Sequence, residues 1–202
     1  MKHIDKETYK IKQENRYKSK PKKTQIIISF SLRKSNYHIV HLQHKEYGKS
    51  KKWNTYTISR EGEIFEHYDP KFYTDFMGIK EVDKKSISVV LENMCSLAKD
   101  GNTYINWLNE PCPEEKVKNK NFLGLKYWES FSEQQFESTV SLCKDLCNQF
   151  NIEKKAIDFH HYNSSVNKFN GIVLKSNYIE NTSNINPLFD LEKFNEMLQE
   201  RN

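Results

Sequence analysis

The chain lacks any hydrophobic run long enough to cross a membrane. Its longest apolar stretches, Ile26–Phe30 and Ile87–Leu91, fall far short of the roughly 18 residues that a spanning helix needs. Their length instead suits buried strands. Residues 1–23 are polar and rich in lysine, without the apolar segment of a secretory signal, so we expect the protein to stay in the cytoplasm of the cell that makes it.

Cysteine is scarce, with four residues in a chain of 202. In a chain without a visible export signal this argues against a disulfide framework. Cys143 and Cys147 stand one helical turn apart and could in principle share a metal ion. Both also fall on the apolar stripe of a predicted helix, which favours packing in the core.

Signatures of several common functions are also missing. The net charge of +5 is concentrated before residue 55, but no RNA-binding, zinc-finger or helix-turn-helix pattern accompanies it. We therefore expect a solvated basic face, and nucleic-acid binding is the least favoured hypothesis. No nucleophile elbow, phosphate-binding loop or dinucleotide fingerprint is present.

What the chain does have is a clear succession of apolar patterns, in a length that suits one domain. In the first half they predict a buried strand over 25–30, a weak helix over 35–47, a hairpin of 53–59 with 63–68, and a central strand over 86–91. Residues 94–131, with Trp107 and Trp128, are predicted to form a long ordered loop pinned by aromatic side chains.

The second half predicts mainly helices. Ser132 followed by Gln135 has the form of a capping box, and the helix after it carries an apolar stripe from Phe136 to Phe150. A short strand over 156–159, an irregular segment over 163–185 and a closing helix over 190–199 complete the pattern. Early strands followed by helices predict an α/β fold, with a mixed central β-sheet flanked by helices.

Four blocks of sequence, in their order and spacing, resemble a known family. They are residues 26–31 (IIISFS), 55–65 (TYTISREGEIF), 86–93 (SISVVLEN), and the pair 157–160 (IDFH) with 183–190 (SNINPLFD). This order is similar to that of the type 2 N-acetylmuramoyl-L-alanine amidases and peptidoglycan-recognition proteins, with the overall look of a bacteriophage endolysin. The resemblance implies a single amidase-like domain over 24–202, preceded by an irregular basic arm over 1–23.

The family binds zinc through two histidines and an aspartate or cysteine, and hydrolysis needs three such ligands with one open position. Carried onto this chain, the first ligand falls at Ser29 or Phe30, the second at His160 and the third at Asn184. Only His160 is a credible zinc donor, because a neutral amide binds zinc poorly and phenylalanine has no donor atom. We therefore expect no bound metal.

The family's supporting residues are changed as well. Its assisting tyrosine falls at Asn54, a lysine at Thr182, a glutamate at Val90 and a histidine at Phe76. Glu92 stands two positions beyond Val90 and would share its face of the strand.

We therefore expect a binding cleft without a confident catalytic residue. It would contain Ser29, Phe30, Asn54, Phe76, Glu92, His160 and Asn184. The resemblance implies a non-catalytic protein that binds peptidoglycan stem peptide or a protein partner, such as a phage structural protein, with a virion as a second possible location.

The alternative is an active zinc amidase, an endolysin, with displaced ligands. His38, His41 and His44 recur at helical spacing and could rebuild a site with His160, although a surface helix is the simpler explanation. His67 is expected to face solvent or to pack locally. The adjacent His160 and His161 would point to opposite faces of a strand.

Overall fold

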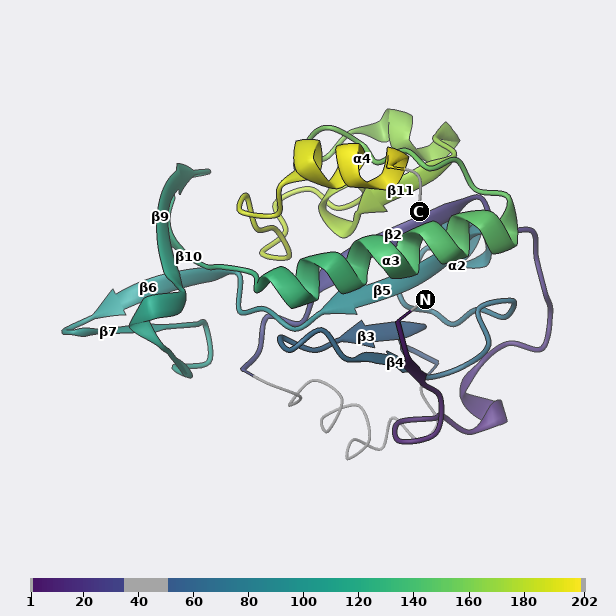
Figure 1. Cartoon of the computed structure of the whole chain (residues 1–202), viewed down its shortest axis with the longest axis horizontal. Helices are drawn as coiled ribbons and strands as arrows, with labels where there is room; N and C mark the ends of the chain where they lie inside the picture. The colour runs from purple at the N-terminus through teal and green to yellow at the C-terminus, as the bar shows by residue number, and fades with distance from the viewer. Residues whose placement is uncertain (1, 35–50, 201–202) are drawn as a thin grey trace.

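The computed structural model describes residues 2–34 and 51–200. The helix expected over 35–47, with His38, His41 and His44, lies outside the described residues. Figure 1 shows two β-sheets beside each other, with the long helix α3 lying across the larger one. No helix in the described part is long and apolar enough to cross a bilayer.

The larger sheet has six strands in the order β1-β4-β3-β5-β2-β11. Their bounds are β1 Ile4–Asp5, β2 Gln25–Phe30, β3 Tyr56–Ile58, β4 Ile64–Glu66, β5 Ser86–Leu91 and β11 Gly171–Leu174. Strands β11, β2, β5 and β3 run parallel, and β4 returns antiparallel to β3. The mixed sheet, the two central strands and the hairpin are thus confirmed.

Both faces of the central strands are buried, which explains their nearly continuous apolar sequence. Ile26 and Ile28 face the core that α3 (Glu133–Phe150) covers, whereas Ile27 lies in a second cluster on the opposite face. That opposite face is covered in part by α2 (Lys80–Lys85), a helix that the sequence did not predict.

Helix α3 begins as predicted at Ser132, whose side chain accepts a hydrogen bond from the backbone N–H of Gln135. The capping box is only half realised, because the side-chain oxygen of Gln135 accepts no hydrogen bond. The Gln135 amide group donates to the carbonyls of Ile58 and Glu92, and so ties the first turn of the helix to the ends of β3 and β5. Helix α4 (Leu191–Gln199), capped by Asp190, packs against α3.

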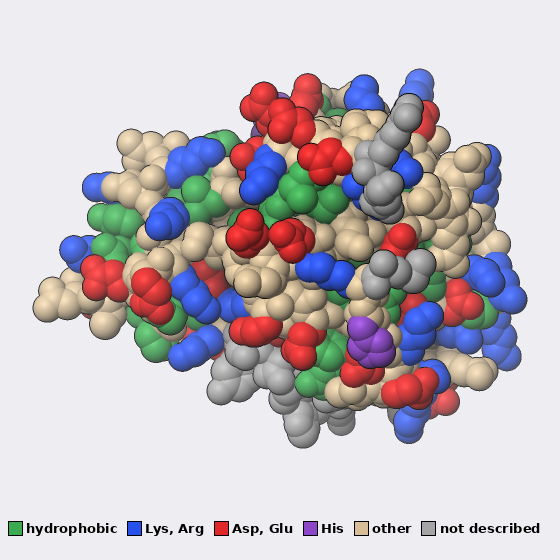
Figure 2. Space-filling view, viewed as in Figure 1, with side chains coloured by type: hydrophobic (Ala, Val, Ile, Leu, Met, Phe, Trp, Pro, Cys, Tyr) green, Lys and Arg blue, Asp and Glu red, His purple; other side chains and the backbone are tan. Residues whose placement is uncertain are grey.

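The surface over α3 is mixed in charge. Figure 2 shows acidic and basic side chains interspersed on this face, with apolar side chains between them. All four cysteines are free and buried, and Cys143 and Cys147 lie in the core, as expected.

The expectation of a long loop over 94–131 is wrong, because this segment folds into a second, antiparallel sheet. Its strands lie in the order β8-β7-β6-β10-β9. Their bounds are β6 Ser96–Asp100, β7 Thr103–Ile105, β8 Pro111–Cys112, β9 Val117–Phe122 and β10 Leu125–Glu129, with the 3-10 turn η3 Glu114–Lys116 before β9. The strands are short, and β6 and β9 are exposed along most of their length, so few apolar residues mark them in the sequence. Trp128 is fully buried and does pin the segment, as expected.

Two further expectations fail near the C-terminus. Residues 156–159 form no strand, and only Ala156 makes an isolated bridge to Ile172. The segment expected to be irregular, 163–185, instead contains the edge strand β11 between the 3-10 turns η4 (Ser164–Lys168) and η5 (Lys175–Asn177). Burial of the apolar residues of β11 against β2 gives this segment its order.

The N-terminal arm is partly regular. It contains β1, which pairs with β4, and the 3-10 turn η1 (Gln13–Asn15). His67 holds the arm against the hairpin: its Nδ1 lies 2.9 Å from the carbonyl oxygen of Tyr9, and its Nε2 lies 2.8 Å from Thr57 Oγ1. His67 is completely buried, so the expectation of a solvent-facing side chain is wrong and that of local packing holds.

Burial lowers the pKa of His67 to about 4, against the opposing contact with Tyr9. Between pH 6.5 and 4 the unfolded chain therefore binds a proton that the folded chain does not. We expect the free energy of unfolding to fall as pH falls through this window, by up to about 3 kcal/mol from this residue. NMR titration of the His67 ring should give a midpoint near 4, and a midpoint of 6 or higher would contradict the prediction.

Candidate functional site

A groove of about 500 Å³ opens where the parallel strands β2 and β5 end. Six positions singled out from the sequence line it: Ser29, Phe30, Asn54, Phe76, Val90 and Asn184. In open α/β sheets, the carboxyl ends of parallel strands are the usual place for ligand sites. The structure thus brings together residues that are up to 155 positions apart in the chain.

The strand register explains this meeting. Ser29 lies opposite Val90, and Val90 lies opposite Thr57, so these three residues are level across β2, β5 and β3. Leu174 pairs with Ile28, which puts Lys175, the next residue, at the same level as Ser29. Because side chains alternate along a strand, Ser29 points with Ile27 away from α3.

Asn184 is held tightly against the end of β2. Its side-chain oxygen accepts hydrogen bonds from the Phe30 backbone N–H and the Ser29 hydroxyl, both at 3.0 Å. Its amide group donates to the Phe30 carbonyl oxygen at 2.6 Å. The Asn184 side chain therefore pairs with both backbone groups of Phe30, and we call this pair of hydrogen bonds the bracket. Both acceptor positions of the Asn184 oxygen are in use.

The other groove positions are also structural or apolar. Asn54 is buried, and its amide donates to the Tyr56 carbonyl and to Thr57 Oγ1. Val90 is buried, and Phe76 lies beneath the ammonium group of Lys175, 4.7 Å from its ring centre. None of these three side chains presents a group that could activate water.

Three predicted site residues lie outside the groove lining. His160 is hydrogen-bonded through Nε2 to the Phe189 carbonyl oxygen at 3.0 Å, so this nitrogen carries the proton. Burial lowers the pKa of His160. Thr182 lines a separate cavity of about 250 Å³ and accepts a hydrogen bond from the backbone N–H of Asn184. His161 shares that cavity and lies against the ring of Phe159.

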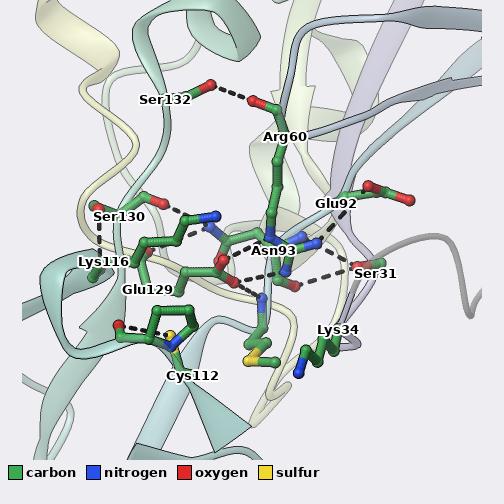
Figure 3. Close-up of polar contacts among 12 residues, drawn as sticks. Ser31, Lys34, Arg60, Glu92, Asn93, Cys112, Lys116, Glu129, Ser130 and Ser132 are labelled. Carbon is green, nitrogen blue, oxygen red and sulfur yellow. Dashed lines mark hydrogen bonds and ion pairs between the residues drawn. The ribbon is translucent and has the colours of Figure 1, made fainter. Parts of the chain in front are cut away.

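Glu92 is the third, and it belongs to a buried ionic network. Strand β5 ends at Leu91, so the alternation that would align Glu92 with Val90 no longer applies. Figure 3 shows Arg60 reaching between Glu129 and Glu92. Arg60 makes two hydrogen bonds to Glu129, at 2.6 and 2.8 Å, and its Nη1 lies 3.8 Å from Glu92.

This network joins the two sheets. Glu129 ends β10 and also accepts a hydrogen bond from the backbone N–H of Met94, while Arg60 lies in the β3–β4 turn. The side chain of Asn93 donates to the backbone carbonyl of Glu129. Burial raises the pKa of Glu92 to about 7, partly opposed by Arg60.

The groove wall contains residues that the sequence analysis did not select. Arg33, Lys52 and Lys175 contribute positive charge, and Trp107 and Leu108 reach over from the second sheet. Trp107 remains 68% exposed, although its indole N–H donates to the Leu32 carbonyl. Lys175 was missed because β11 was missed. The apolar run Ile172–Leu174 was the only sequence signal for its position.

Zinc does not fit the donor atoms described at this groove. They are a hydroxyl and a neutral amide, both committed to hydrogen bonds with β2 or each other. Within residues 2–34 and 51–200, no group of three His, Cys, Asp or Glu side chains could hold a metal ion.

The chain is similar to known proteins in its fold but not in its sequence. No family model matches the chain, and no curated protein is similar to it in sequence. Among solved structures, it is similar to the N-acetylmuramoyl-L-alanine amidase LysC from Clostridium intestinale, with a TM-score of 0.58 and 12% identity over 100% of both chains. The endolysin LysCS of the same organism has the same TM-score and identity, over 100% of this chain and 98% of its own.

A mutant endolysin from Bacillus subtilis is similar over 98% of this chain and 99% of its own, with a TM-score of 0.54 and 14% identity. At such identities the likeness concerns the fold alone. The chain therefore has the fold of the type 2 amidases and endolysins, as the sequence resemblance implied.

The Arg60 network yields a test of how the sheets are joined. In Arg60→Met, Glu129 and Glu92 would remain buried without their cation, so we expect the free energy of unfolding at pH 7 to fall by about 3 kcal/mol. Lys84→Met is the control, because its pair with Glu81 is exposed and should change stability by less than about 1 kcal/mol. Equal effects of the two substitutions in chemical denaturation would refute this role.

The bracket formed by Asn184 can be tested separately. Asn184→Asp replaces the amide donor with an oxygen that faces the Phe30 carbonyl, so we expect a loss of about 1–3 kcal/mol in unfolding free energy. Asn121→Asp, on the exposed strand β9, makes the same chemical change without a partner and serves as the control. Unchanged stability of Asn184→Asp would contradict the bracket.

Proposed function

We propose that this protein is a non-catalytic relative of the type 2 amidases that binds peptidoglycan stem peptide in the groove at the ends of β2 and β5. The observation that carries the proposal is the bracket between Asn184 and Phe30. In the family resemblance, the first and third zinc ligands fall at these positions. Here an amide side chain and a backbone bond to each other instead.

The chemistry of hydrolysis supports the same proposal. A zinc amidase needs three protein ligands and a water whose pKa the metal lowers. At this groove, the side chains at the first and third positions are hydroxyl, phenyl and amide. His160 donates its Nε2 proton to a carbonyl oxygen and lies off the groove lining.

The groove still has the features of a peptide site. It is open, it combines apolar walls with polar edges, and it lies at the strand ends where ligands bind in many α/β proteins. A phage particle or the cytoplasm of an infected cell is the proposed setting. An active endolysin is the second candidate, favoured by the full-length likeness in fold to such enzymes.

Zinc analysis with a digest separates the two candidates. The purified full-length chain, incubated with equimolar zinc and desalted, should retain well under one zinc ion per chain. Incubated with purified sacculi, it should co-sediment with them and release no stem peptide detectable by mass spectrometry. His160→Ala should behave like the wild type in the digest, and an active amidase serves as the positive control.

Stoichiometric zinc together with release of stem peptide would establish the endolysin and overturn the proposal. A failure to bind either sacculi or soluble muropeptides would also overturn it, because binding is the activity proposed.

A further inference from the structure

The groove contains a half-buried cation, Lys175, that forms no ion pair with a described carboxylate. Lys175 is the first residue of η5 and follows β11 directly, level with Ser29. Its ammonium group lies 4.7 Å from the centre of the Phe76 ring. Among the described residues, no carboxylate lies within 4.0 Å of this group and no acceptor hydrogen-bonds to it.

The surroundings of Lys175 favour an added anion. Burial lowers the pKa of Lys175, and the charge of Asp83 opposes this only in part. The Phe76 ring stabilises a cation weakly compared with a carboxylate, which both pairs with the charge and accepts hydrogen bonds. An anionic ligand would therefore gain more from Lys175 than from a fully hydrated surface lysine.

The rest of the lining has the same sign. Arg33 and Lys52 line the groove with Lys175, and none of the described lining residues is acidic. Glu110 pairs with Arg33 at 3.5 Å, but it does not line the groove. Positive charges along a cleft with low-dielectric walls focus the field and attract anions.

The groove also has an apolar part, which an inorganic anion bound to Lys175 would leave without a contact. Trp107 and Leu108 come from the turn between β7 and β8, and both are exposed beside the groove. The hydrogen bond from the indole to Leu32 fixes the ring while its face stays open. A peptide that carries both a carboxylate and aliphatic carbon atoms matches this combination.

We infer that Lys175 binds a free carboxylate of the stem peptide. Its ammonium group supplies the positive charge that this carboxylate meets at the strand ends. This inference rests on the function proposed above and adds the ligand group and the residue that recognises it. In a peptide such as L-Ala-D-γ-Glu-L-Lys, the γ linkage leaves the α-carboxylate of glutamate free. Its C-terminal carboxylate is a second candidate, and both are anions of the required kind.

The test is a calorimetric titration of the full chain with L-Ala-D-γ-Glu-L-Lys and with the same peptide amidated at both carboxylates. We expect the acidic peptide to bind at least about tenfold more tightly than the amidated one, since hydrogen bonds between charged groups are worth about 1.5–3 kcal/mol. Lys175→Met should weaken binding of the acidic peptide by a similar factor, and Lys175→Arg should restore most of it.

Lys126→Met is the matched control, because Lys126 also lies over an aromatic ring, that of Tyr127 at 5.3 Å, but on β10 outside the groove lining. It should leave affinity unchanged. Circular dichroism and thermal midpoints show whether each variant is folded. If Lys175→Met fails to fold, the affinities of the wild type for the acidic and the amidated peptide still test whether a carboxylate is bound.

The outcomes separate the two proposals. Binding of the acidic peptide that is unaffected by amidation or by Lys175→Met would overturn the role of Lys175 and leave the proposed function in place. No binding of either peptide or of sacculi to the folded wild type would overturn both.

Discussion

The parallel alignment of β11, β2, β5 and β3 is the constraint on which the rest of the structure depends. Four strands that run in one direction end at one edge of the sheet, and their register puts Ser29, Val90 and Thr57 at one level, with Lys175 directly after the last residue of β11. The apolar residues of β2 and β5 are buried on both faces and hold this alignment. A shift of one residue would turn every side chain to the opposite face and abolish the groove.

At that edge, polar groups that could otherwise bind a ligand form hydrogen bonds with each other. The Asn184 side chain pairs with the backbone of Phe30, and Asn54 pairs with the carbonyl of Tyr56. Such pairing satisfies buried polar atoms and stabilises the loop that carries Asn184. It also gives the groove an interior of apolar carbon and fixed amides. The polarity that a ligand meets then comes mainly from the cationic side chains around it.

The second sheet adds a wall that a simple sheet-and-helix domain would lack. Its junction with the first sheet is the pairing of Arg60 with Glu129, reinforced by Glu92 and by Asn93. The turn that carries Trp107 is held beside the end of β2 by hydrogen bonds from the side chains of Asn106 and Trp107 to the carbonyl oxygen of Leu32. Arg60 also donates to the backbone carbonyl of Arg33, which lines the groove, so the junction and the groove are in direct contact.

The sequence by itself determined the elements whose signal is local. Continuous apolar runs indicated β2 and β5, the paired patterns of 53–59 and 63–68 indicated the hairpin, and Ser132 indicated the start of α3. The family resemblance also named six residues that line the groove, four of them within the resembling blocks. Only the tertiary structure decided where the others go: a buried His67, a Glu92 paired with Arg60, and a His160 bonded to Phe189. The short strands β6–β11 likewise required partners distant in sequence. The physical reason is that pairing and burial depend on what a side chain meets across the fold, which its own neighbours in the chain do not specify.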